Sequence, residues 1–216
     1  MKIQQFSNAE DLLKYKNEVV LLFTLRHEHV IDVIDFNFEL FPKQKNPYFL
    51  YLVMELANET VADLIKKNAL NFKDIEILQI LYDMVEALNF SNSLNIPHSD
   101  VKPNNIARVG SIYKLLDWGA ATLTDDPEKI SGTIKKVPAK ELELSILYVS
   151  PDFYRTWMMV DDDDENKKEE KEVEINFIKN DVYSLGITIL EMFNMNIKAI
   201  SKEKKKMVPL APNLHD

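Results

Sequence analysis

The residue types that could do chemistry gather in the stretch His98–Asn105 and at Asp117. Asn105 follows Asp100 by five residues, so both side chains can face one point from opposite sides of a tight loop. Asp117 comes just after the next pair of short strands and can return to the same point. Two carboxylates and an amide are oxygen ligands that suit Mg²⁺, and the ammonium of Lys102 suits phosphate. The set fits phosphoryl transfer; an ordinary solvated turn is the alternative, because Asp, Asn, Pro and Ser are common in turns.

These residues need a scaffold, and hydrophobic periodicity predicts one of mixed helices and strands. A capping box at Ser7–Glu10 begins a predicted helix that runs to about Leu25. The other expected elements are strands at 27–37, 48–55, 106–109 and 113–116, and helices at 74–90 and 181–193. In the helix at 74–90, the inward stripe is expected to be Ile77, Leu81, Met84, Val85 and Leu88. The chain should therefore form a small α/β piece and then a mainly helical piece, with a boundary near residues 57–63.

The stretch His98-Ser99-Asp100-Val101-Lys102-Pro103-Asn104-Asn105 resembles the catalytic loop of eukaryotic-type protein kinases, His-Arg-Asp followed by Lys-Pro-x-Asn. Asp117-Trp118-Gly119 is similar to the metal-binding Asp-Phe-Gly of that family, with tryptophan in place of phenylalanine. The resemblance implies that Asp100 is the catalytic base and that Lys102 contacts the γ-phosphate. It also implies that Asn105 and Asp117 bind Mg²⁺. A lysine two residues after the aspartate is the serine/threonine-kinase pattern.

Further segments match the same family in its usual order. Tyr51–Ala57 resembles the hinge strand, which makes Met54 the gatekeeper and implies that the backbone of Glu55 and Ala57 holds adenine. By the same resemblance, Ala107 is expected beneath the adenine ring. Two other segments resemble the substrate-positioning segment and the start of the buried F helix, namely Ser145–Asp152 and Asp181–Gly186.

The family's nucleotide-binding lysine has a candidate in Lys2. The stretch His27–Ile31 resembles the segment after the family's C helix, which makes Glu18, nine residues before it, the candidate partner of that lysine. Lys2 precedes Glu18 by sixteen residues, within the family's usual spacing. A solvated lysine near a chain terminus is the alternative for Lys2. For His27 and His29 the alternatives are metal ligation and strand packing, of which packing is favoured.

The sequence also departs from the family pattern. Glycine occurs only at positions 110, 119, 132 and 186, so no glycine-rich loop can precede residue 110. The resemblance covers about residues 2–193. We therefore expect an α+β, two-lobed protein-kinase-like fold, truncated at both ends, with an incomplete N-lobe, whose first two strands are missing, and an incomplete helical C-lobe. The expected divisions are a partial N-lobe at 1–57, a partial C-lobe with the catalytic loop at 58–193, an acidic insertion at 160–176 and a tail at 194–216.

The formal net charge of −9 comes mostly from one segment. Between Asp161 and Glu174 lie nine acidic residues and three lysines, a local balance of −6, which leaves −3 for the rest of the chain. This distribution argues against a nucleic-acid partner. A solvated insertion is expected, although positions 161, 163, 165 and 172 also have the spacing of a calcium loop that lacks its glycine. Without cysteine or an apolar run long enough to cross a membrane, we expect a cytoplasmic protein, with a nuclear location also open.

The function that the resemblance implies is ATP-dependent phosphorylation of serine or threonine in protein substrates, with Mg²⁺ as the metal. The alternative interpretation is a pseudokinase or scaffold that binds partners without phosphotransfer. The absence of a glycine-rich loop before residue 110 supports the alternative. The presence of Asp100, Lys102, Asn105 and Asp117 supports the enzyme.

Overall fold

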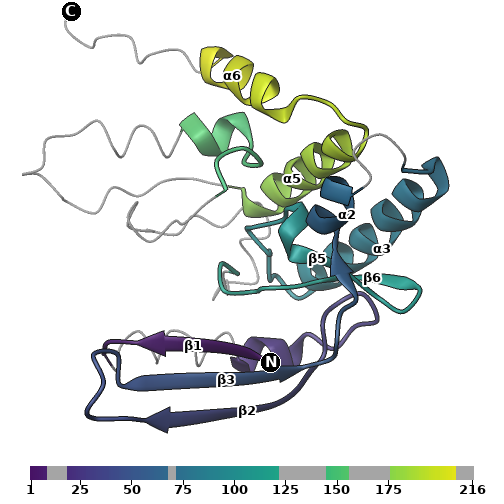
Figure 1. Cartoon of the computed structure of the whole chain (residues 1–216). Helices are drawn as coiled ribbons and strands as arrows, with labels where there is room; N and C mark the ends of the chain where they lie inside the picture. Colours follow the sequence, from purple (N-terminus) through teal and green to yellow (C-terminus); the bar gives the residue numbers. More distant parts are fainter. Residues whose placement is uncertain (9–18, 68–71, 122–144, 156–175, 208–216) are drawn as a thin grey trace, which may run out of the picture.

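The computed structural model describes residues 1–8, 19–67, 72–121, 145–155 and 176–207. The chain forms two bodies (Figure 1). One is a three-stranded sheet with the helical segment at 19–24, and the other is a group of helices around a second small sheet. We refer to them as the first and second lobes. The predicted positions of Glu18 and of nearly all the acidic insertion lie outside the described residues, as does most of the predicted helix that begins at the capping box.

The sheet of the first lobe has the order β1-β3-β2, with both neighbouring pairs antiparallel. Its strands are Lys2–Phe6 for β1, Val33–Leu40 for β2 and Tyr48–Met54 for β3. The central strand β3 is rich in aromatic and apolar residues, which suits a half-buried pleated surface, and its Leu50 and Leu52 are buried. The strand predicted at 48–55 is confirmed. Lys2 lies opposite Leu52, at the end of the sheet nearest the second lobe.

The strand predicted at 27–37 is wrong in its first half, because β2 begins only at Val33. Residues 29–31 instead bond to the second lobe: the N–H of Leu115 donates to the carbonyl of His29 at 2.8 Å, and the N–H of Ile31 donates to the carbonyl of Leu115 at 3.1 Å. Val30 and Ile31 are buried there. Apolar alternation therefore marked a buried extended segment correctly, but it could not show which sheet that segment joins.

Among the described residues, the second lobe contains the sheet β4-β5-β6, the helices α2, α3, α5 and α6, a helical turn at 151–155 and one 3₁₀ turn. Their bounds are Glu59–Thr60 for β4, Val61–Lys67 for α2, Asp74–Ser93 for α3, Pro103–Asn105 for η1, Ile106–Val109 for β5, Ile112–Leu115 for β6, Phe177–Met192 for α5 and Ile197–Met207 for α6. The predicted strands and helices in this region are confirmed, with shifted ends. Helix α5 begins earlier than the predicted residue 181 because the side chain of Asn176 caps it, accepting from the N–H of Lys179 at 2.9 Å. The expected tail contains α6, in which Ile197 and Ser201 are buried.

Helix α3 packs a slightly different face from the predicted one. Ile77, Met84 and Leu88 are buried as expected, but Val85 is 48% exposed. Ile80 and Ala87 take the place of Val85 in the core. Residues 84 and 85 lie about 100° apart around a helix, so a narrow apolar stripe cannot bury both equally.

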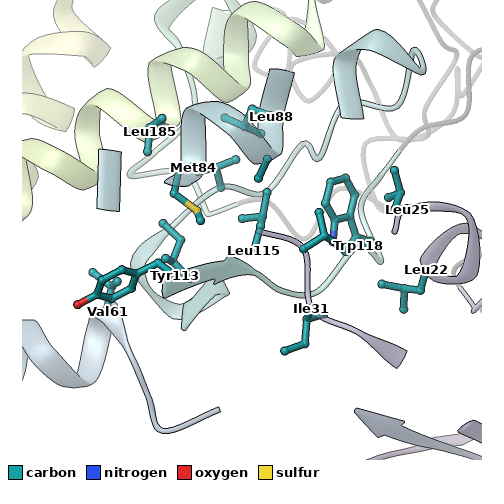
Figure 2. Packing of buried hydrophobic residues seen from close by; sticks show 14 of the residues in the cluster. Leu22, Leu25, Ile31, Val61, Met84, Leu88, Tyr113, Leu115, Trp118 and Leu185 are labelled. Carbon is teal, nitrogen blue, oxygen red and sulfur yellow. The ribbon is translucent and has the colours of Figure 1, made fainter. Parts of the chain in front are cut away.

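One hydrophobic core runs through both lobes. Figure 2 shows Trp118 and Leu115 with Leu22 and Leu25 of the first lobe on one side and Met84 and Leu88 of α3 on the other. All of these side chains belong to the same buried cluster. The segment that carries Asp117 and Trp118 is therefore fixed between the lobes by packing.

Candidate active site

A buried carboxylate on α5 binds the backbone of the catalytic-loop stretch. The backbone N–H groups of His98 and Ser99 donate to the two oxygens of Asp181, at 2.7 and 2.8 Å. Asp181 is completely buried, and burial raises its pKa to about 7 even though these two hydrogen bonds act to lower it. The sequence placed Asp181 at the start of a buried helix but did not identify it as a site residue. A charged side chain in an otherwise apolar helix was the available signal.

His98 joins the loop to the strand β6 and the segment after it. Its Nδ1 accepts from the N–H of Asp100 at 3.2 Å, so Nε2 carries the proton and donates to the carbonyl of Leu116 at 2.8 Å. Burial lowers the pKa of His98, which keeps the ring neutral at pH 7. The ring also contacts Trp118 edge-on, with centroids 4.7 Å apart.

Asp100, Lys102 and Asn105 form one hydrogen-bonded cluster. The ammonium of Lys102 lies 2.6 Å from Oδ2 of Asp100, and the amide N–H of Asn105 donates to the same oxygen at 3.0 Å and to the carbonyl of Asp100 at 2.9 Å. Lys102 also donates to Oγ of Ser145 at 2.8 Å. The sequence pattern indicated Ser145 only as the start of the expected substrate-positioning segment. Its contact with Lys102 spans 43 residues. The cluster, defined here as these four residues, leaves the amide oxygen of Asn105 as an available ligand.

Asp117 reaches the site from the other side, through a contact with Lys2. Nζ of Lys2 lies 2.9 Å from Oδ1 of Asp117, across 115 residues of sequence. Asp117 has a left-handed backbone, with φ of 57°, which is uncommon for residues other than glycine but tolerated by Asp. Burial acts to raise the pKa of Asp117, but the charge and hydrogen bond of Lys2, together with smaller contributions from His98 and the N–H of Gly119, outweigh it and the pKa is lowered. Asp117 is therefore a carboxylate at neutral pH.

The predicted adenine-binding residues lie where the two lobes join. Met54 ends β3 opposite Val33, and Glu55 follows it, with its N–H donating to the carbonyl of Asp32 at 3.0 Å. In the described part of the chain, the N–H of Ala57 donates to no protein acceptor. Ala107 is fully buried in β5. The N–H of Ala57 is thus available to a ligand, whereas the side chain of Ala107 is covered in this structure.

The oxygen donors present fit a magnesium ion that takes most of its ligands from water and substrate phosphates. Among the described residues there is no group of three His, Cys, Asp or Glu side chains that could hold a metal by themselves. Mg²⁺ usually keeps several waters and is bound through one or two carboxylates together with substrate phosphates. The carboxylate of Asp117 and the amide oxygen of Asn105 suit that mode of binding.

The histidines near the lobe junction are packed, as the favoured interpretation predicted, but neither lies in a strand. His27 stacks on Phe90 with ring centroids 4.7 Å apart, and Nδ1 of His29 lies 3.1 Å from the carbonyl oxygen of Tyr113.

No helix within the described ranges is long and apolar enough to span a membrane.

Comparison with known proteins identifies the family. The sequence pattern of the protein kinase domain matches residues 1–210. The chain belongs to the protein kinase domain family.

Individual kinases are about 28% to 33% identical to the chain over the aligned residues. A dual specificity protein kinase, zak2, of Dictyostelium discoideum is 28% identical over 166 residues, covering 76% of this chain and 22% of that kinase. A Wee1-like protein kinase of Arabidopsis thaliana is 29% identical over 168 residues, covering 76% of this chain and 28% of that kinase. Cyclin-dependent kinase-like 1 of Caenorhabditis elegans is 33% identical over 131 residues, covering 58% of this chain and 35% of that kinase. The chain spans between about a fifth and about a third of the length of these relatives.

Proposed function

We propose that this protein kinase domain transfers the γ-phosphate of ATP to serine or threonine hydroxyls of proteins. The observation that carries the proposal is the Asp100–Lys102–Asn105–Ser145 cluster, in which base, cation and amide lie within hydrogen-bonding distance of one another. Phosphoryl transfer depends on positioning and charge stabilisation. A carboxylate, an ammonium and an amide held together by neighbouring backbone supply both.

In the proposed reaction, Asp100 orients the attacking hydroxyl and accepts its proton. Its Oδ2 receives both Lys102 and Asn105, and Oδ1 has no hydrogen-bond partner among the described residues. Oδ1 is therefore the oxygen available to the incoming hydroxyl. Lys102, anchored between Asp100 and Ser145, places its positive charge where negative charge develops on the transferred group.

The nucleotide end is assigned to Asp117, Asn105 and Lys2. Asn105 and Asp117 would hold Mg²⁺, which when bound neutralises the charge of the phosphate oxygens. In the described structure Lys2 is paired with Asp117, so Lys2 is already beside the oxygens that the metal needs. When nucleotide binds, the ammonium of Lys2 can move to a phosphate oxygen, because Asp117 would then have Mg²⁺ as its positive partner. The backbone of Glu55 and Ala57 is proposed to bind adenine above Ala107, with Met54 beside it.

The preference for serine or threonine is proposed from the contact of Lys102 with Ser145. Lys102 is the residue type that the serine/threonine pattern requires two positions after the base. Its hydrogen bond to Ser145 ties the loop to the segment expected to position the substrate. The named relatives include a dual specificity kinase, so tyrosine acceptors belong in the same assay.

A scaffold without phosphotransfer is the second candidate. The feature that counts against it is the intact hydrogen bonding of Asp100, Lys102 and Asn105, which a pure binding module does not need.

The proposal is tested by phosphotransfer from labelled ATP to a peptide mixture with Ser, Thr and Tyr acceptors, beside Asp100→Asn. Loss of a positioned general base typically costs about 100- to 10,000-fold in rate, so the variant should be inactive at the same protein concentration. Asp117→Asn should abolish the thermal shift that Mg²⁺-ATP produces in the unaltered chain. Asp74→Asn, at an exposed position outside the proposed site, is the matched control and should behave like the unaltered chain. Equal phosphotransfer by Asp100→Asn, or a melt of the unaltered chain that nucleotide does not move, would overturn the proposal.

A further inference from the structure

The side chain of Glu55 makes contacts that the proposed function does not use. Its Oε1 accepts from the N–H of Asp32 at 2.8 Å and from Nζ of Lys114 at 2.6 Å. The N–H of Glu55 donates back to the carbonyl of Asp32. The first residue after β3 is thus fixed by two backbone contacts to one segment and by an ion pair to the second lobe.

Lys114 is an unusual cation for its position, because it points onto the floor of the proposed adenine site. It lies in β6 directly opposite Ala107 of β5, and directly opposed residues of an antiparallel pair project on the same face of the sheet. Its side chain is only 9% exposed. A buried ammonium is costly without a close partner, and among the described residues the carboxylate of Glu55 is its only one.

The segment that contacts Glu55 is itself tied to β6. Residues 29–31 bond to Leu115 on both sides of a parallel bridge, and Asp32 follows directly. Leu115 is the neighbour of Lys114. Glu55 is therefore held by two routes that end at adjacent residues of the same strand, one through backbone hydrogen bonds and one through the ion pair.

We propose that Lys114 is a positioning residue for nucleotide binding, acting through the carboxylate of Glu55. The ion pair holds the segment Glu55–Ala57 in the orientation that presents its backbone to the base, so that this segment does not have to be ordered when nucleotide arrives. The proposal rests on the proposed function, since it concerns the adenine end of the same site. It predicts an effect on ATP affinity with little effect on the chemical step, because Lys114 touches none of the cluster around Asp100.

The test compares Lys114→Met with Lys114→Arg and with the control Lys67→Met. Lys67 makes an ion pair of similar length, 2.7 Å to Glu59, on a side chain that is 64% exposed, so its loss reports on a lysine–glutamate pair outside the proposed site. The dissociation constant for Mg²⁺-ADP is measured by calorimetry, and KM for ATP and kcat by phosphotransfer. For Lys114→Met we expect the dissociation constant and KM to rise about tenfold, as for the loss of one hydrogen bond to a charged group, with kcat within about twofold. Lys114→Arg should restore most of the affinity, and Lys67→Met should change neither constant.

A second variant keeps the test decisive if Lys114→Met does not fold. Glu55→Gln retains an acceptor for the N–H of Asp32 and removes only the charge that pairs with Lys114, and it should give the same rise in KM. In a folded double variant the two effects should not add. An unchanged dissociation constant in either folded variant would overturn the inference alone. A rise in kcat at unchanged KM would also overturn it, because the pair would then restrain lobe movement. Failure of the unaltered chain to bind Mg²⁺-ADP would overturn the proposed function and this inference with it.

Discussion

The catalytic loop and the Lys2–Asp117 contact lie on opposite sides of one site and are held in different ways. The loop is fixed by a buried carboxylate, a buried imidazole and several short hydrogen bonds. Lys2 contacts Asp117 through an ion pair whose side chains are 29% and 48% exposed. Buried networks are costly to disturb, whereas exposed ion pairs contribute little to stability. The contacts of the loop are therefore part of the buried structure, whereas the contact between Lys2 and Asp117 lies at a partly exposed position, where we expect partners to change more easily.

The first way to test this contrast is Asp181→Ala. It leaves the N–H groups of His98 and Ser99 buried without their acceptor, and we expect a loss of about 3 to 5 kcal/mol in the free energy of unfolding at pH 5. Urea unfolding followed by circular dichroism measures it. Asp152→Ala, at an exposed aspartate, is the control and should change stability by less than about 0.5 kcal/mol. A loss for Asp181→Ala no larger than that of the control would show that the loop does not depend on α5.

The pH dependence of stability sharpens the same point. The pKa of Asp181 is raised to about 7 in the folded chain from an ordinary value of 3.8, so its stabilising contribution is full below about pH 4 and is lost as pH rises through 7. Relative to Asp181→Asn, the unaltered chain should lose about 2 to 3 kcal/mol between pH 5 and pH 8. The pKa of His98 is lowered by burial, so its contribution has the opposite sign and falls as pH drops. That term is common to both proteins and cancels in the comparison. A difference that stays constant with pH would mean that Asp181 is ionised throughout.

Trp118 lies between the two regions and should tolerate substitution better than its burial suggests. Its indole N–H is buried without a hydrogen-bond partner in the described part of the chain. Trp118→Phe removes that unsatisfied group, which offsets the loss of packing, so we expect a net change within about 1 kcal/mol. Thermal unfolding of the variant beside Trp157→Phe, the chain's other tryptophan, measures it. A loss of several kcal/mol would mean that the indole is held by an interaction that its surroundings do not show.

The smallest effect on stability is expected for Lys2→Met. Because the ion pair with Asp117 is partly exposed, the free energy of unfolding should change by less than about 0.5 kcal/mol. Affinity for Mg²⁺-ATP should nevertheless fall, since the proposed role of Lys2 is at the phosphates. Unfolding and calorimetric titration on the same preparation separate the two, with Lys67→Met as the control. A large loss of stability would remove the contrast between the two sides of the site.

Sequence reasoning succeeded where the signal is local. The spacing of Asp100, Lys102 and Asn105 within six residues identified the loop, and apolar periodicity located β3, α3 and α5. Local patterns could not show Asp181 beneath His98, Ser145 against Lys102 or Lys114 against Glu55, because these pairs are 83, 43 and 59 residues apart. Lys2 is the extreme case, since nothing around a single lysine near a terminus indicates a partner 115 residues away.

The bonding of residues 29–31 to Leu115 has a consequence for how the cleft can move. The chain crosses between the lobes at Glu55–Ala57, and this backbone ladder makes a second connection beside that crossing. Because these two connections lie side by side, we expect the lobes to move least at this place. Any opening of the lobes should therefore be a rotation about a hinge at Glu55–Ala57 and residues 29–31.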